Sequence, residues 1–447
     1  MNRYLKAVAI RLPILRKIYL DKEALRQELA EVEGQRDGFL RERDWAEAKL
    51  QELYAYHHKL EADIERVYAG HGELEKEINF LKFRMGTLDQ LHEEVVQRKW
   101  SGDNAWRQYM CMFPFERIEI LPGGEVYTCC SGAVKNGFSI GNIFTHSIDE
   151  IWNSDNAKKL RYSVAKGDFE YCLESCIYWK NREQKLYPIV DRQESDYGDY
   201  CQCSVAKGPG HIVLSCDETC NLQCKSCRIS KHGLTKEESG KLEAVLLQKV
   251  RPLLADCFQL DLLGSGEVFA SAACMSFLKT LTAEEFPHLQ LGIITNGQLF
   301  TRERWAGLEN LKGIPLHFTV SVDGAERETY EKLRLGGKWD VLCRNMSFLG
   351  GLRKAGQVEE FTLHFVVQRE NFRQMKDFVS LAERWGADQV NFLGLDNWGT
   401  YSPEEYSRMN VFTSGNPHRQ EAEELLDKVV RNARGIQVLH NIPGLKV

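Results

Sequence analysis

The run His211-Ile-Val-Leu-Ser215 is followed, after four further residues, by Cys220-Asn-Leu-Gln-Cys224-Lys-Ser-Cys227, and this stretch decides the fold. The apolar run predicts a buried strand, and three thiols then lie on the loop that leaves it. Iron–sulfur clusters are held by cysteine thiolates, and a complete set of ligands is four. Three cysteines therefore leave one iron open to a substrate or cofactor, as catalytic zinc keeps an open position.

The spacing Cys-x3-Cys-x2-Cys, with Asn-Leu after the first cysteine and Arg228 after the last, resembles the signature loop of radical S-adenosylmethionine (SAM) enzymes. The resemblance implies that Cys220, Cys224 and Cys227 hold a 4Fe-4S cluster that binds SAM. Ser226 stands where many members of the family carry an aromatic residue that touches the adenine.

A fourth thiol, Cys216, lies four residues before the signature loop. If Cys216 were a ligand, the cluster would be closed and suited to electron transfer only. The alternative, which we favour, is a buried free cysteine at the end of the strand, because cysteine packs as a small hydrophobic side chain.

The composition of the 447-residue chain indicates its class and compartment. Hydrophobic residues make up 43%, enough for a sizeable core, and the net charge of -6 argues against a general nucleic-acid binder. Arg11 and Pro13 interrupt the N-terminal apolar stretch, so no secretory signal is expected, and no apolar run is long enough for a membrane span. We therefore expect the 14 cysteines to be metal ligands rather than disulfides, in a reducing cytoplasm.

Two N-terminal segments have different patterns. Residues 1–20 combine basic side chains with apolar residues at helical spacing, and such a leader can lie on an anionic membrane surface or dock on protein. Residues 21–100 contain no proline and repeat an apolar residue every seven positions from Leu25 to Val95. Heptads sustained over this length predict a coiled coil, through which the chain self-associates or binds a partner helix.

A cysteine-rich segment, residues 109–204, precedes the signature loop. Alternating apolar residues around a Pro-Gly-Gly turn predict a β-hairpin, and two helices follow near residues 147–153 and 158–164. This order, with its Ile-Gly-Asn-Ile turn and terminal cysteine pair, resembles the SPASM or twitch module of many radical SAM enzymes. The resemblance implies an auxiliary 4Fe-4S cluster with four ligands: Cys111, Cys129, Cys172 and Cys176.

The sequence does not assign a role to the other cysteines of this segment. Cys130 is expected on the opposite face of the strand from Cys129, whereas Cys201 and Cys203 either complete a further site or replace one of the four ligands. A zinc site of four cysteines is the alternative, less favoured because the neighbouring loop already indicates iron–sulfur chemistry. In the family the auxiliary module normally follows the catalytic domain, and here it precedes it.

Residues 209–400 alternate apolar strands with amphipathic helices. The predicted strands are 211–215, 259–263, 289–295, 316–322, 362–367 and 389–393. Such βα units predict an α/β fold with a parallel sheet, and the family resemblance makes it a partial (β/α)6 barrel with its chemistry at the carboxyl ends of the strands. Residues 401–447 are expected to form a helical extension with a short strand near 436–439, covering the open side of the barrel.

Polar motifs follow the successive strands. Gly264-Ser-Gly266-Glu267 resembles the family motif for the amino group of SAM, since glycine lets the backbone approach a ligand and a carboxylate accepts from an ammonium. Arg334 is a candidate partner for the SAM carboxylate, with a surface salt bridge as the alternative. Similar segments in the family contact the ribose and the methionine carboxylate, and here they contain Thr295, Asn296, Ser321 and Asp323.

Weaker candidates lie further along the chain. Gln368 and Asn371 follow the fifth strand as polar residues do in relatives, while Asn391 and Trp398 are expected to line the substrate pocket.

The resemblance implies an oxidoreductase that cleaves SAM reductively to a 5′-deoxyadenosyl radical, which then abstracts hydrogen from a substrate. A peptide or protein is the expected substrate, with a sugar or small metabolite as the alternative, and the electron donor is expected to be of flavodoxin or ferredoxin type. The competing hypothesis is a non-catalytic iron–sulfur electron carrier or scaffold, which leaves the polar turns without a ligand.

Overall fold

The computed structural model describes residues 109–442, except 136–137, 166, 168, 174–175, 177–185, 189–202, 232 and 263–264. The predicted leader and coiled coil, residues 1–100, therefore lie outside the described residues, as do Cys201 and Gly264.

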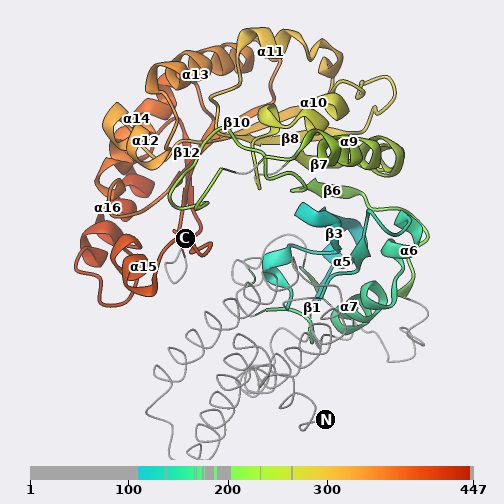
Figure 1. The fold of residues 1–447 in the computed structure, drawn as a ribbon. Coiled ribbons are helices and arrows are strands. Elements are labelled where there is room, and N and C mark those ends of the chain that lie inside the picture. The colour runs from blue at the N-terminus through green and yellow to red at the C-terminus, as the bar shows by residue number, and fades with distance from the viewer. Residues whose placement is uncertain are drawn as a thin grey trace, which may run out of the picture. The chain divides into compact units, whose positions relative to one another are not determined.

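One ten-stranded sheet organises the described part (Figure 1). Neighbouring strands from β12 to β2 pair in parallel, whereas β2–β3 and β3–β4 pair antiparallel. In sheet order the strands are β12 (Gln437–His440), β11 (Gln389–Leu393), β10 (Glu360–Val366), β9 (Leu316–Ser321), β8 (Gln290–Thr295), β7 (Gln259–Leu262), β6 (His211–Leu214), β2 (Arg117–Ile120), β3 (Glu125–Tyr127) and β4 (Gly141–Asn142).

The six strands predicted between residues 211 and 393 are β6 to β11, so the α/β class with a mostly parallel sheet is confirmed. Helices connect these strands along one side of the sheet (Figure 1). They are α9 (Lys236–Val245), α10 (Ala272–Leu278), α11 (Arg302–Ala306), α12 (Arg327–Leu333), α13 (Trp339–Lys354) and α14 (Met375–Trp385).

The first connecting helix changes geometry along its length. The sequence predicts one helix over residues 236–254, but α9 passes into a π-helical turn at Leu246–Val250 and a 3-10 helix at Arg251–Ala255. The break coincides with Pro252, which has no N–H to donate to the preceding turn.

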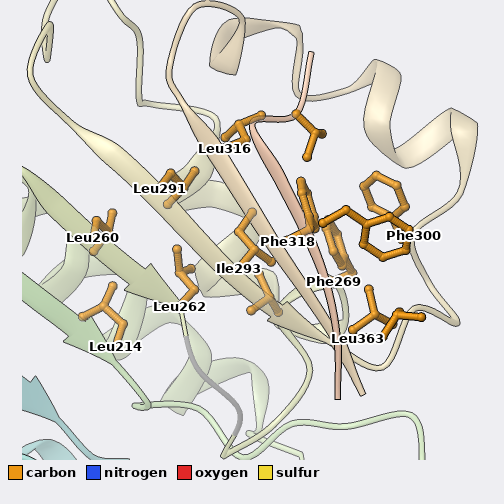
Figure 2. Close-up of a cluster of buried hydrophobic side chains, with 14 of the residues drawn as sticks. Leu214, Leu260, Leu262, Phe269, Leu291, Ile293, Phe300, Leu316, Phe318 and Leu363 are labelled. Atoms are coloured by element: carbon orange, nitrogen blue, oxygen red, sulfur yellow. The ribbon is translucent and has the colours of Figure 1, made fainter. Parts of the chain in front are cut away.

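The two faces of the sheet differ in chemistry because side chains alternate along each strand. One face packs against the helices, with leucine and isoleucine of the strands meeting the rings of Phe269 and Phe300 (Figure 2). The opposite face is polar near the amino ends of the strands, where His211 and Asp261 form a 2.7 Å ion pair and His317 lies two strands beyond Asp261.

The cysteine-rich segment extends the same sheet. Its strand β2 pairs with β6 from Arg117 opposite His211 to Ile120 opposite Leu214, and β3 and β4 continue outward, so the predicted hairpin is confirmed. The hairpin turn needs glycine at Gly124, where φ is 85° and a Cβ would overlap the ring of Phe144. Its other elements are β1 (Tyr109–Cys111), α5 (Phe113–Glu116), α6 (Ile148–Trp152), α7 (Asp155–Ala165) and β5 (Leu186–Pro188).

The C-terminal segment contributes two helices and a strand. Helices α15 (Pro403–Met409) and α16 (Arg419–Asn432) precede β12, which pairs in parallel with β11. Among the described residues, no helix is both long enough and apolar enough to cross a membrane.

Candidate functional site

The three cysteines of the signature loop lie close to one another beyond the end of β6. Burial raises the pKa of Cys224 above its usual value, and the neighbouring thiols of Cys227 and Cys220 raise it further. Each thiol also has a donor: Leu222 N lies 3.4 Å from the Cys220 Sγ, and the side chains of Arg228 and Arg334 donate to Cys227 and Cys224. Such donors stabilise thiolates, so the loop suits a metal cluster with three cysteine ligands.

Cys216 interacts with a cysteine of α10. Its hydrogen bond with Cys274 of α10 is the largest cause of its raised pKa, followed by burial, and both side chains are buried. The structure therefore places Cys216 in the core beside α10.

The turn after β7 packs directly on the backbone that leads to the signature loop. A Cβ on Gly266 would lie 2.5 Å from Thr219 O and closer still to Asp217 O, so only glycine fits. The next residue, Glu267, donates its N–H to Thr219 O at 2.8 Å. Arg228 adds a second link by donating to the carbonyl oxygens of Glu218 and Ser265.

The carboxylate of Glu267 is 2% exposed and joins this turn to the end of β8. It accepts from Thr295 Oγ1 and from Asn296 N, each at 2.6 Å. Burial raises the pKa of Glu267, and these hydrogen bonds oppose the rise. Asn296 in turn donates from Nδ2 to Asn221 of the signature loop, at 2.9 Å. Glu267, Thr295 and Asn296 thus fix the positions of three loops relative to one another.

Asp323 and Arg334 form a buried ion pair beside the loop cysteines. Asp323 has a positive φ of 64° and its Oδ2 lies 2.6 Å from Arg334 Nη2, while its Oδ1 accepts from Val366 N. The Arg334 side chain is 13% exposed, so the alternative of a surface salt bridge does not hold. Burial disfavours its charge, but Asp323 and Cys224 outweigh that effect and raise the pKa of Arg334. Within the described residues its buried Nε has no acceptor.

The remaining sequence candidates have varied surroundings. Ser321 and Asn391 flank His364 on the polar face of the sheet. Asn371 holds the loop after β10 by donating to Asp323 O and Val366 O, whereas Gln368 is fully buried and its amide has no partner in the described part of the chain. Trp398, expected to line a substrate pocket, is 73% exposed.

A cavity of about 600 Å³ lies against the signature loop. Its wall combines Lys225 and Arg228 of the loop with residues after β10 and β11, among them Glu370, Thr400 and Tyr401. The hydroxyls of Thr400 and Tyr401 and one oxygen of Glu370 are buried without a partner among the described residues. Sequence reasoning missed these three residues, because no recognisable motif marks them.

The auxiliary thiols also converge, in a separate apolar cluster. Burial raises the pKa of Cys129, and the nearby thiols of Cys111, Cys172 and Cys176 raise it further. Cys130 instead receives a hydrogen bond from Arg117. Among the described residues, no group of three His, Cys, Asp or Glu side chains is arranged to hold a single metal ion. The assignment of a cluster therefore depends on the mutual proximity of four thiols.

Cys203 lies apart from that set. Its carbonyl oxygen accepts from Arg161 Nη1 at 3.2 Å, and burial raises the pKa of its thiol.

Comparisons with known proteins agree with these two sites. Residues 111–177 match the SPASM family, an iron-sulfur cluster-binding domain. The mycofactocin maturase MftC of Mycobacterium tuberculosis is 24% identical over 203 residues, which is 43% of this chain and 48% of that protein. The same maturase of Mycolicibacterium smegmatis is 25% identical over 203 residues. The chain thus spans about half the length of the curated relatives it matches.

Among solved structures, Streptococcus suis SuiB bound to precursor peptide SuiA is similar with a TM-score of 0.40 and 13% identity, covering 67% of this chain and 65% of that chain. The structure of anSMEcpe with bound AdoMet and a peptide has a TM-score of 0.34 and 16% identity, covering 51% of this chain and 62% of that one.

The three-cysteine loop, the polar turns beside it, the SPASM match and the sequence relatives agree with one another. The chain therefore matches the SPASM iron–sulfur cluster-binding domain at residues 111–177, before its three-cysteine loop, and is similar over 203 residues to the mycofactocin maturases.

Proposed function

We propose that the chain is an enzyme that cleaves SAM reductively at a 4Fe-4S cluster on Cys220, Cys224 and Cys227. One observation carries the proposal: three thiols converge beside the buried, positively charged guanidinium of Arg334. The Nε of that guanidinium has no acceptor among the described residues. An arginine next to an open coordination position suits the carboxylate of an amino-acid ligand.

We also propose that β6 to β11 with their helices form the partial (β/α)6 barrel of this family. The supporting observation is that these six strands follow chain order and pair only in parallel. The signature loop and the polar turns all follow carboxyl ends of strands, where barrels of this kind carry their sites.

The residues at the site have distinct roles in this proposal. Arg334 holds the SAM carboxylate through Nε, and Asp323 keeps its charge in place from the opposite side. Glu267 keeps the turn after β7 against the loop and offers its remaining lone pair to the amino group. A cluster on the three cysteines would supply one electron to the sulfonium, releasing the 5′-deoxyadenosyl radical.

The cavity of about 600 Å³ is the proposed place for the rest of the cofactor and the reacting part of the substrate. Its size falls among small-molecule sites, which span roughly 300–1,000 Å³. The unpartnered hydroxyls of Thr400 and Tyr401 offer hydrogen bonds there. Ser321 is proposed to contact the ribose or the methionine carboxylate.

The auxiliary cysteines Cys111, Cys129, Cys172 and Cys176 are proposed to hold a second 4Fe-4S cluster. Four thiols in a buried apolar cluster make a closed site, suited to accepting an electron from an oxidised substrate or to passing one on. The first electron comes, in this proposal, from a flavodoxin or ferredoxin-type donor.

A peptide or protein is the proposed substrate, because the relatives found by sequence are maturases. A sugar or small metabolite is the second candidate, since the unpartnered hydroxyls of Thr400 and Tyr401 in the cavity can bind hydroxyl groups equally well. Assembly through the predicted coiled coil and contact of residues 1–20 with a membrane surface also remain proposals, and both lie outside the described residues.

Anaerobic reconstitution with SAM and dithionite tests the reaction directly. We expect methionine and 5′-deoxyadenosine in equal amounts, and we expect Cys216→Ala to keep its cluster and its activity. If protein fully loaded with iron produced neither product, the scaffold or electron-carrier function would replace the enzyme.

A further inference from the structure

Arg117, the first residue of β2, is a buried cation that sequence reasoning did not single out. Arg117 is 5% exposed, and within the described part of the chain its Nε and Nη1 have no acceptor. Leaving buried charged donors unsatisfied costs free energy, and native structures rarely do so without a reason.

The nearest carboxylate does not satisfy these donors. Glu119 Oε2 lies 3.9 Å from Arg117 Nη2, too far for a hydrogen bond, and the same oxygen accepts from Ser131 N at 2.7 Å. On its apolar side, Arg117 lies 5.8 Å from the ring centroid of Phe113.

The guanidinium instead faces the auxiliary thiols. In the antiparallel pair of β2 and β3, Glu119 is opposite Tyr127, the last residue of β3, and Cys129 follows two residues later. The positive charge of Arg117 lowers the pKa of the Cys129 thiol, against the larger effect of burial, and the guanidinium donates a hydrogen bond to Cys130. Arg117 therefore acts on Cys129, one of the four proposed ligands, and on the neighbouring Cys130.

A second buried arginine of the same module shows what a purely structural role requires. Arg161 is fully buried, but its Nε donates to Pro114 O at 2.8 Å and its Nη1 to Asn153 Oδ1 at 3.0 Å. It also stacks on Trp152, 4.3 Å from the ring. Arg161 is not among the groups that shift the pKa of Cys129. Two of the three Arg161 guanidinium nitrogens thus donate to protein acceptors and only Nη2 has none among the described residues, whereas Arg117 leaves both Nε and Nη1 without an acceptor.

We propose that Arg117 donates hydrogen bonds from Nε and Nη1 to the sulfur atoms of the auxiliary cluster and holds the reduction potential of that cluster high. The proposal depends on the auxiliary cluster of the proposed function. Hydrogen bonds to sulfur and the net charge around a cluster set its potential, and a nearby cation favours the reduced form, which carries one more negative charge.

The position of Arg117 also connects the cluster with the polar face of the sheet. Arg117 is paired with His211 across β2 and β6, and its charge helps to stabilise the carboxylate of Asp261 on β7. The guanidinium thus acts both on a thiol of the auxiliary set and on a carboxylate of the polar face of the sheet.

The test uses the full-length chain with Cys220, Cys224 and Cys227 replaced by alanine, so that the auxiliary site holds the only cluster. Iron and sulfide content is measured first, followed by the midpoint potential in a titration monitored by electron paramagnetic resonance. We compare Arg117→Gln, Arg117→Lys and the matched control Arg161→Gln.

We expect Arg117→Gln to shift the midpoint to a more negative potential, Arg117→Lys to shift it less in the same direction, and Arg161→Gln to leave it unchanged. If Arg117→Gln fails to take up iron, the midpoint potential of Arg117→Lys alone tests the proposal, and a shift to a more negative potential would support it. Midpoints equal to that of the parent in both Arg117 variants would overturn the proposal, as would a parent that binds no cluster. Because SAM cleavage is not part of the assay, these outcomes do not bear on the radical chemistry.

Discussion

The two sets of thiols differ in how they are enclosed. In the signature loop, Cys227 is exposed, and cationic side chains of Arg228 and Arg334 lie against the sulfur atoms. In the auxiliary set, the thiols belong to a hydrophobic cluster, and a single buried arginine, Arg117, lies among the groups that act on Cys129. The first set is open and positively charged, as binding an anionic ligand requires, while the second lies in apolar surroundings, with Cys172 half-buried.

The two sets also lie at opposite ends of one strand. The signature loop follows the carboxyl end of β6, whereas Arg117, which acts on the Cys129 thiol, is opposite His211 at its amino end. Under the proposed function, one sheet would support ligand chemistry at one end and electron transfer at the other, because the surroundings of the two sets of thiols differ.

Removing one cysteine from each set should have the largest effect and separates their functions. Cys224→Ser should abolish SAM cleavage and leave the auxiliary cluster in place, because one set does not depend on the ligands of the other. Cys172→Ser should remove the auxiliary cluster, leave the cluster of the signature loop in place and keep most of the SAM cleavage. The measurements are iron content, electron paramagnetic resonance and the yield of 5′-deoxyadenosine.

Equal loss of both clusters in both variants would mean that the two sites form only together. In that case, the contrast between an open and a closed site would not describe two independent centres.

The second prediction concerns the cation of the open site. Arg334→Leu should lower the free energy of unfolding by about 3–5 kcal/mol, because it leaves the buried carboxylate of Asp323 without a partner. Chemical denaturation of the metal-free protein measures this loss. Adding Asp323→Asn should restore part of the stability but not SAM binding, measured by calorimetry on the reconstituted protein. Full SAM affinity in the double variant would show that Arg334 only neutralises Asp323.

The smallest effect is expected at the turn that supports the open site. Gly266→Ala should destabilise the protein by roughly 1–3 kcal/mol and reduce SAM cleavage, since the new Cβ would overlap the carbonyl oxygens of Asp217 and Thr219. Gly240→Ala is the matched control, because a Cβ there meets nothing within 4 Å and the residue lies inside α9. It should stabilise the helix by about 1 kcal/mol. Thermal unfolding of both variants gives the comparison, and similar losses in both would contradict the role of the turn.

Local features were predictable from the sequence. The spacing of Cys220, Cys224 and Cys227 brings their thiols together on one loop, and apolar runs located β6 to β11 because such strands are buried and short. The grouping of Cys111 with Cys129, Cys172 and Cys176 was available only through the family resemblance.

Features that depend on distant segments were not predictable. The pairing of β2 with β6 joins residues far apart in the chain, and nothing in either run specifies that register. The free donors of Arg117 and the buried hydroxyl of Tyr401 exist only because separate segments surround them. The burial of Arg334 was likewise not predictable, because its sequence context is equally compatible with an ion pair on the surface.

The pairing of β2 with β6 has a consequence for the route of an electron through the protein. Main-chain hydrogen bonds over four residues join the two modules, from Arg117 opposite His211 to Ile120 opposite Leu214. In the proposed function, the separation of the two clusters includes the rise of that strand, on the order of 10 Å, and does not depend on the chain between them. Insertions between Cys176 and His211 should then leave the tunnelling distance between the proposed clusters unchanged.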